Sequence, residues 1–184
     1  MTKLFFTKVL QGAPHIFLIN KSFRTRNISL LVPETLLYYL ALHIKLATSA
    51  RASQLVDIFA YENPVSSVNT STIASSSSPV LVYQFHNLFS QERLFAFTVS
   101  INSGEAASPK SLTELFTTSA WLEREVGEMH SICFGGKKDL RNLMLQYGDA
   151  SAPFQKSYPS IGVKELFYDS VTDNLVQVPV TTQI

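Results

Sequence analysis

The sequence predicts an α+β fold: a single two-layer domain whose mixed β-sheet carries helices mainly on one face. Helical spacing of apolar residues begins at Glu34 and again near Ser119, and three strand-like segments lie between these helices. The order helix–strand–strand–strand–helix–strand is typical of α+β domains. A hydrophobic fraction of 46% in 184 residues is enough for one substantial core. We expect a basic N-terminal arm (1–33), an α+β core (34–146) and an extended tail (147–184).

The N-terminal segment, residues 1–33, is basic and contains no acidic residue before Glu34. Its basic residues are Lys3, Lys8, Lys21, Arg24 and Arg26. This composition is shared with organelle transit peptides, but we interpret the segment as a retained, ordered arm that lies on a partner. A local extension packed on its own domain and a patch for anionic lipid are the alternatives.

The first helix is predicted from Glu34, with Pro33 or Thr35 at its start. The helical face is formed by Leu36, Leu37, Leu40 and Ile44. We expect His43 to pack in the core or at an interface. A strand follows at 54–61 and ends before Pro64.

A serine- and threonine-rich loop, residues 65–79, precedes a predicted hairpin of strands 80–86 and 93–101. Two sets of residues alternate along the second strand. One set (Phe95, Phe97, Val99 and Ile101) marks the core face and the other (Leu94, Ala96, Thr98 and Ser100) the more polar face.

Ser111 and Glu114 have the spacing of a capping box, which predicts a short helical piece over 111–116. The second main helix begins near Ser119 and is expected to end at Gly135–Gly136. Its apolar face consists of Leu122, Val126, Met129 and Cys133, which recur at steps of three and four.

The same helix is unusually charged, with Glu123, Arg124, Glu125 and Glu128 close together in a chain whose charged fraction is only 16%. An exposed pair such as Arg124–Glu128 contributes about 0.3–0.5 kcal/mol, so stability is a poor reason for the cluster. The two interpretations are a solvated helix face and a face that meets another protein.

The tail is interrupted by Pro153 and Pro159, which exclude a continuous helix. Two further strands are predicted at 163–168 and 175–178, around a turn at 169–174. These strands form the terminal strand pair of the extended tail.

We predict no catalytic, cofactor-binding or metal-binding residues. A single cysteine, Cys133, cannot form an internal disulfide or hold an iron–sulfur cluster, which needs about four ligands. His130 lies one helical turn from Cys133, and we favour buried packing over a thiolate–imidazole couple. The four histidines lack metal-site spacing, and a net charge of +1 disfavours nucleic acid. No apolar run approaches the ~18 residues of a membrane span.

The residue order from Trp121 to Met144 resembles one family: the 30 kDa-type subunit of respiratory complex I, the proton-pumping NADH:ubiquinone oxidoreductase, in its mitochondrial form. The matching positions include Glu123-Arg124-Glu125, Glu128, Lys137, Asp139-Leu140-Arg141, Leu143-Met144, Pro153, Lys156, Tyr158, Pro159, Gly162, Pro179, Val180, Thr182 and Gln183. The resemblance is strong over 119–184 and weaker over 34–118. The sequence departs from the family pattern at Gly127, His130, Lys138, Gln155 and Ser157.

The resemblance implies a non-catalytic scaffold subunit of the peripheral arm, on the matrix side of the mitochondrial inner membrane. Its partners would be the large quinone-site subunit and cluster-bearing neighbours, with FMN, iron–sulfur clusters and ubiquinone on those partners. The implied interface residues are Glu123, Arg124, Glu125, Glu128, Asp139, Arg141, Tyr147, Pro153, Lys156 and Tyr158. The alternatives are the same scaffold role in a related membrane-bound hydrogenase, and a stand-alone protein-binding module.

Overall fold

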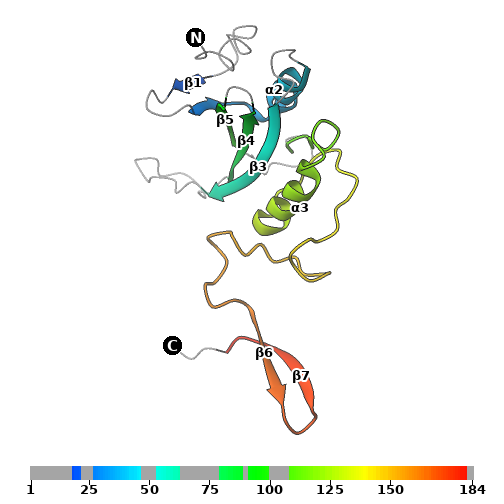
Figure 1. Cartoon of the computed structure of the whole chain (residues 1–184). Coiled ribbons are helices and arrows are strands. Elements are labelled where there is room, and N and C mark those ends of the chain that lie inside the picture. The colour runs from blue at the N-terminus through cyan, green and yellow to red at the C-terminus, as the bar shows by residue number, and fades with distance from the viewer. Residues whose placement is uncertain are drawn as a thin grey trace, which may run out of the picture.

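The computed structural model describes residues 18–21, 27–46, 53–62, 79–88, 91–99 and 108–181. Two helices and seven strands are defined within this part of the chain (Figure 1). They are β1 (Leu18–Lys21), β2 (Asn27–Leu31), α2 (Glu34–Leu46), β3 (Ser53–Glu62), β4 (Pro79–Asn87), β5 (Arg93–Val99), α3 (Ser119–His130), β6 (Lys164–Asp169) and β7 (Asn174–Pro179).

A five-stranded mixed sheet forms the centre of the domain, in the order β1-β2-β5-β4-β3. β2 and β5 run parallel, with Asn27 opposite Arg93, and the other neighbouring strands are antiparallel. The predicted mixed sheet is therefore confirmed. The predicted hairpin is β4–β5, with Val80 opposite Val99, while residues 100 and 101 lie outside the described part.

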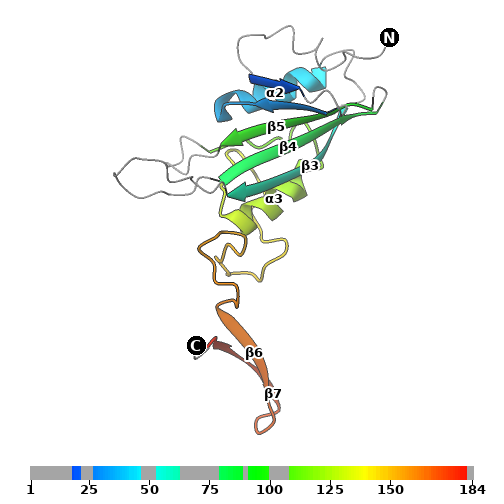
Figure 2. The same cartoon turned by 90° about the vertical axis from the view of Figure 1, so that its left-hand side faces the viewer.

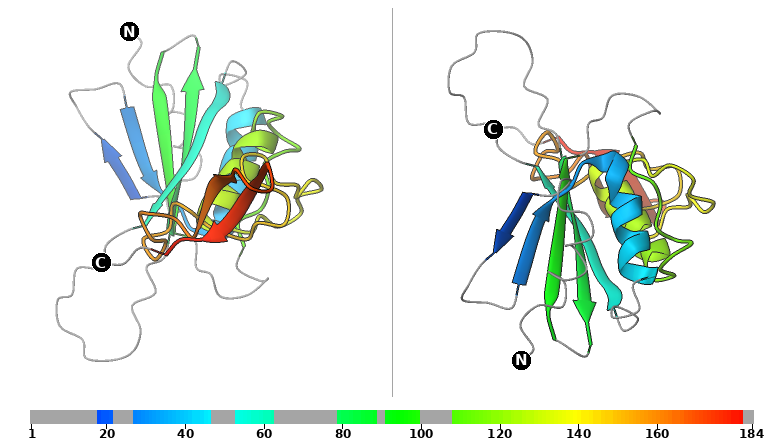
Figure 3. Two further views of the ribbon diagram at one scale, coloured as in Figure 1. Left: turned by 90° about the horizontal axis from the view of Figure 1, so that it is seen from below. Right: turned by 90° about the horizontal axis from the view of Figure 1, so that it is seen from above.

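Both helices lie on the same face of the sheet, as the views along the sheet show (Figures 2 and 3). In α2 the buried residues are Leu37, Leu40, Ala41 and Ile44, which follow the predicted helical spacing. They join Val126 of α3 and the facing strand residues in one hydrophobic cluster. The predicted two-layer α+β architecture is confirmed. His43, in contrast, is exposed, so of its two predicted roles packing in the core is wrong, and packing at an interface stays a prediction.

The core face of β5 is the opposite of the predicted one. Leu94, Ala96 and Thr98 are fully buried, while Phe95 and Phe97 are only half-buried. The register explains this result, because Leu94 and Ala96 lie opposite Phe85 and Tyr83 of β4. These two large rings fill the space beneath the helices, so smaller side chains are needed on the neighbouring strand.

The predicted N-terminal arm is wrong in part, because β1 and β2 belong to the core sheet. β2 pairs with both β1 and β5, and its Leu30 is fully buried. The domain therefore includes residues from this segment, ahead of the predicted boundary at 33/34. Most of the basic residues, Lys3, Lys8, Arg24 and Arg26, lie outside the described residues, as does most of the serine-rich loop.

Two helix predictions around α3 are wrong. In place of the predicted helical piece over 111–116 there is a turn at 113–115, and Glu114 is exposed and does not close a capping box. α3 ends at His130, well before the two glycines, because Ser131 adopts the left-handed conformation (φ 58°) that reverses the chain. Ile132 then donates its N–H to the carbonyl of Gly127 at 3.1 Å. Cys133 consequently lies off the helix and is exposed, so the prediction that it packs in the core is also wrong.

β6 and β7 form a separate two-stranded hairpin that extends away from the domain (Figures 1 and 2). The predicted strand pair and its turn are confirmed, with Asp169 opposite Asn174 at the turn end. Apolar side chains occupy both faces of this hairpin, and none of its residues is fully buried. An isolated two-stranded hairpin is at best marginally stable in water, so this element needs cover from elsewhere.

The hydroxyl of Tyr83 is buried without a hydrogen-bond partner among the described residues. Burial, followed by the charges of Glu123 and Glu34, raises the pKa of the phenol well above its ordinary value. We expect Tyr83→Phe to leave the free energy of unfolding unchanged or to raise it by up to about 1 kcal/mol, because it removes an uncompensated desolvation cost. Urea unfolding measures this, with the exposed Tyr39→Phe as control. A loss above about 1 kcal/mol would contradict it.

Candidate protein-docking surface

The carboxylate of Glu123 is buried at the base of α3, where it is 1% exposed. Its Oε1 accepts the N–H of Leu112 at 2.7 Å, and its Oε2 accepts the hydroxyl of Ser111 at 2.7 Å. Lys137 Nζ lies 3.2 Å from the same Oε2 and also donates to the carbonyl of Ala120 at 3.0 Å. Burial lowers the pKa of Lys137, and the charge of Glu123 opposes that shift. Glu123 therefore joins three chain segments within the domain.

The guanidinium of Arg124 holds the loop that follows α3. Its Nε donates to the carbonyl of Arg141 at 2.8 Å and its Nη2 donates to the carbonyl of Asn142 at 3.1 Å. Nη1 lies 3.6 Å from Asp139 Oδ2, and the guanidinium carbon lies 5.8 Å from the centre of the Trp121 ring. A planar fork with several donors suits this contact with two successive carbonyls.

Glu128, one turn further along α3, holds the next part of the same loop. Its carboxylate accepts the backbone N–H groups of Met144 at 2.7 Å, Leu143 at 3.1 Å and Leu145 at 3.2 Å. Because a charged acceptor strengthens each of these hydrogen bonds, one side chain fixes three consecutive residues. The predicted Arg124–Glu128 pair is not among the ion pairs of the described residues.

Asp139 and Arg141 form an exposed local pair. Arg141 Nε and Nη2 donate to the two carboxylate oxygens of Asp139 at 3.0 and 2.9 Å. The side-chain and backbone hydrogen bonds from Arg141 lower the pKa of the Asp139 carboxyl far below its ordinary value. Glu125 differs from its neighbours, because its carboxylate has no hydrogen-bond partner in the part of the chain that the structure describes.

The charged cluster thus serves mainly inside the chain. The prediction that Glu123 faces a partner is wrong, because the carboxylate is buried and fully bonded within its own domain. The assignment of Arg124, Glu125, Glu128, Asp139 and Arg141 to an interface stays a prediction, but all of them except Glu125 have internal partners. The sequence feature that could have indicated this internal role is that charged residues lie both before and after the chain reversal at the end of α3: Glu123, Arg124 and Glu128 before it, and Lys137, Asp139 and Arg141 after it.

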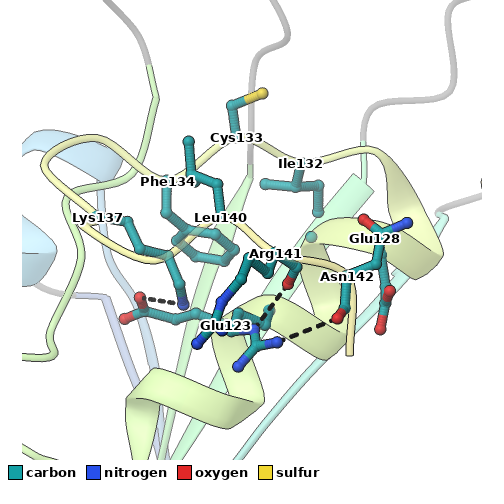
Figure 4. A pocket seen from close by; sticks show the side chains of 11 residues that line it. Glu123, Glu128, Ile132, Cys133, Phe134, Lys137, Leu140, Arg141 and Asn142 are labelled. Atoms are coloured by element: carbon teal, nitrogen blue, oxygen red, sulfur yellow. Dashed lines mark hydrogen bonds and ion pairs between the residues drawn. The ribbon is translucent and has the colours of Figure 1, made fainter. Parts of the chain in front are cut away.

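A pocket of about 280 Å³ lies between α3 and the loop (Figure 4). Apolar side chains of Ile132, Phe134 and Leu140 line it together with the charged groups described above. Cys133 is the only thiol at this pocket, and no histidine lines it. Lys137 points toward Glu123, whereas Cys133 points away from this ion pair (Figure 4). The lining residues therefore do not supply the nucleophile, base and orienting acid that covalent catalysis uses.

Large apolar side chains are exposed along the chain from Leu140 to Leu175, and we refer to them as the C-terminal apolar surface. Its members are Leu140, Met144, Tyr147, Phe154, Ile161, Val163, Leu166, Phe167, Tyr168, Val171 and Leu175. Tyr147, predicted as an interface residue, is 79% exposed. The predicted Lys156 is exposed, while Pro153 and Tyr158 are half-buried. So many exposed large apolar side chains within one segment are typical of a protein-binding region.

Sequence reasoning missed most members of this surface. Their alternation in 163–168 and 175–178 predicts strands, but it does not reveal that the strands have no layer packed on them. No group of three or more histidine, cysteine, aspartate or glutamate side chains is placed to hold a metal ion within the described ranges. The same part of the chain contains no helix that is long and apolar enough to cross a bilayer.

The chain is similar to known proteins over most of its length. The model of the family described as "Respiratory-chain NADH dehydrogenase, 30 Kd subunit" matches residues 30–164. An NADH-quinone oxidoreductase subunit of Ruegeria pomeroyi is 31% identical over 134 residues, which cover 73% of this chain and 61% of that protein. An NADH-ubiquinone oxidoreductase subunit of Paramecium primaurelia is 32% identical over 121 residues, which cover 64% of this chain and 56% of that protein. The chain spans about half to three fifths of the length of the first curated relatives it matches.

Two solved structures have the same fold. The trypsin-resistant fragment of Nqo5 matches with a TM-score of 0.58 and 20% identity, over 74% of this chain and 100% of the fragment. A chain of an archaeal respiratory membrane complex, the membrane-bound sulfane sulfur reductase, matches with a TM-score of 0.68 and 16% identity, over 85% of this chain and 84% of that one. At these identities the likeness shows the fold alone.

Proposed function

Because the chain belongs to the family of 30 Kd subunits of respiratory-chain NADH dehydrogenase, we propose that it is a non-catalytic scaffold subunit of respiratory complex I. In this role it lies in the peripheral arm and supports the quinone-reducing module in electron transfer from NADH to ubiquinone. The names of the two relatives, an NADH-quinone and an NADH-ubiquinone oxidoreductase subunit, support this reaction. The matching fold in a sulfane sulfur reductase chain indicates that the fold alone does not select the reaction.

The observation that carries the proposal is the C-terminal apolar surface. Its aromatic members Tyr147, Phe154, Phe167 and Tyr168 are of the residue types that are enriched in protein–protein interfaces. The hairpin β6–β7 exposes Leu166 and Tyr168 on one face and Phe167 on the other, so a partner must cover both faces. This arrangement favours a subunit of a larger assembly over a stand-alone module.

We propose that FMN, the iron–sulfur clusters and ubiquinone are held by partner subunits, chiefly the large quinone-site subunit and its cluster-bearing neighbours. The charged side chains of α3 are already engaged within the chain, and the pocket beside them offers no catalytic set of residues. We further propose a position on the matrix side of the mitochondrial inner membrane. The NADH-ubiquinone oxidoreductase subunit of Paramecium supports this location.

Replacing Tyr147 by alanine is expected to reduce incorporation of the chain into the assembly. Truncation of a tyrosine that becomes buried in an interface commonly costs about 2 kcal/mol or more, roughly thirty-fold in affinity. The isolated chain should keep its stability, because the side chain is 79% exposed in it. Native gels of detergent extracts, stained for NADH-dependent dye reduction and probed for this chain, measure the incorporation.

The matched control is Tyr39→Ala on α2, a tyrosine that is 61% exposed and lies outside the C-terminal apolar surface. This variant should migrate with the assembly as the unmodified chain does. Equal losses for both tyrosines would remove the support for the C-terminal apolar surface. Migration of the unmodified chain as a small free species would contradict the scaffold role itself and favour a stand-alone module.

A further inference from the structure

His130, the last residue of α3, is buried between the domain and the tail. Only 5% of it is exposed, and its ring lies edge-on to the ring of Phe154 with 5.6 Å between the ring centres. Phe154 itself is largely exposed, so its contact with His130 is partial. The histidine is therefore covered in part by a tail residue whose own ring is largely exposed.

The tail is held here by few hydrogen bonds, all of them close to His130. Phe154 donates its N–H to the carbonyl of Met129 at 3.0 Å, and the side chain of Gln155 donates to the carbonyl of His130 at 3.0 Å. Lys156 donates its backbone N–H to Glu62 Oε2 at 3.1 Å, which connects the tail to the end of β3. Residues 154–156 thus form the seat of the tail on the domain.

The surroundings of the imidazole favour its neutral form. Nδ1 is buried without a hydrogen-bond partner in the described part of the chain, so a proton on it would be an unsatisfied buried donor. Burial lowers the pKa of His130, against the opposing effects of the Glu62 carboxylate and a hydrogen bond to the carbonyl of Ala60. The charged residues at this site are Glu62 on β3, whose carboxylate acts on the ring, and Lys156 on the tail, which contacts Glu62 through its backbone N–H and is itself exposed.

We propose that His130 makes the seating of the C-terminal segment dependent on pH, so that protonation of its buried ring releases residues 154–156 from the domain. The pH-dependent release itself does not depend on the proposed function. Its effect on assembly does, since the released segment belongs to the C-terminal apolar surface. Release is less costly than global unfolding, because it separates one partial ring contact and a few hydrogen bonds.

The lowered pKa of His130 determines the direction in which the seating of the tail changes with pH. The seated state prefers the neutral ring, so its advantage is fully present above the ordinary histidine pKa of 6.5 and is lost as the pH falls below that value. Because the released state binds the additional proton, the equilibrium shifts toward release by at most about tenfold per pH unit.

Hydrogen exchange of the purified full chain tests the proposal. The protection factor of the Phe154 amide, corrected for intrinsic exchange, should fall by up to about tenfold between about pH 7.5 and about pH 5.5. Amides of β4 report global unfolding and should keep their protection. In His130→Phe, which keeps an aromatic ring but cannot titrate, the protection of the Phe154 amide should be the same at both pH values.

Glu62→Gln distinguishes the effect of the histidine from that of the neighbouring carboxylate. If His130 is responsible, this variant keeps the pH dependence, because Glu62 favours the protonated ring and its loss lowers the histidine pKa further. Loss of the pH dependence in Glu62→Gln with retention in His130→Phe would overturn the proposal. If His130→Phe fails to fold, an NMR titration of the unmodified chain decides: the ring must titrate below 6.5, at the pH where the loss of Phe154 protection levels off. The readout uses the free chain, so it is independent of assembly.

Discussion

Glu123→Gln is expected to lower the free energy of unfolding by about 3–5 kcal/mol, the usual cost of leaving one partner of a buried ion pair uncompensated. The side chain of Lys137 is almost completely buried beside Glu123 and would lose its counter-charge. The amide would also present an NH₂ group where the carboxylate now accepts the hydroxyl of Ser111 and the N–H of Leu112. Urea or thermal unfolding of the purified chain measures the loss.

Two further variants separate the ion pair from the general effect of changing a glutamate on α3. Glu125→Gln should change the stability by less than about 0.5 kcal/mol, because this carboxylate has no partner within the described residues. The double variant Glu123→Gln/Lys137→Met should recover part of the loss, because no buried charge remains without a partner. A double variant less stable than Glu123→Gln alone would contradict the role of Lys137 as a charge that needs Glu123.

Glu128→Ala is expected to release residues 143–145 from α3. Its carboxylate accepts three backbone N–H groups, and each hydrogen bond to a charged group contributes about 1.5–3 kcal/mol. After discounting for the partial exposure of Glu128, we expect the free energy of local opening to fall by about 3 kcal/mol, roughly a hundred-fold in amide exchange. Alanine is a strong helix former, so α3 itself should persist.

Hydrogen exchange read by mass spectrometry or NMR measures the protection of the Met144 amide, which makes the 2.7 Å contact with Glu128. Glu125→Ala is the matched control on the same helix and should leave this protection unchanged. If Glu128→Ala retained the protection of the Met144 amide, the loop would be held by Arg124 alone. Because Met144 and Tyr147 belong to the C-terminal apolar surface, the release should also weaken incorporation into the assembly.

The elements that were predictable from the sequence are those formed by local patterns. Helix α2, the hairpin β4–β5 and the hairpin β6–β7 each have a periodicity that lies within one continuous segment. β1 and β2 have only four and five residues, β2 pairs with the distant strand β5, and β1 pairs with β2, so their own sequence contains little signal. The core face of β5 was mispredicted for a similar reason, because the large rings that exclude Phe95 and Phe97 belong to β4.

The charged cluster could be located from the sequence, but the role of its members could not. Whether Glu123 meets a partner or its own chain depends on the segment before α3, which supplies Ser111 and Leu112, and on the path of the chain after α3, which brings Lys137. That path is set by the left-handed conformation of Ser131, a residue type with no strong preference for it. The sequence pointed to the two later glycines, which are better suited to that conformation. The family resemblance, in contrast, gave the fold and the family correctly.

The parallel pairing of β2 with β5 has a consequence for the order in which the chain acquires its structure. β2 is synthesised early but cannot pair until β5 has been synthesised. In contrast, β4 pairs with β3 and with β5, its neighbours in the order of the strands. Contacts between distant segments carry a larger entropic cost of loop closure and slow the folding. Until β2 pairs with it, β5 has unpaired backbone hydrogen-bonding groups along one edge, which can pair with another chain. The newly made chain is thus most vulnerable to aggregation after β3, β4 and β5 have paired and before β2 and β1 have joined the sheet.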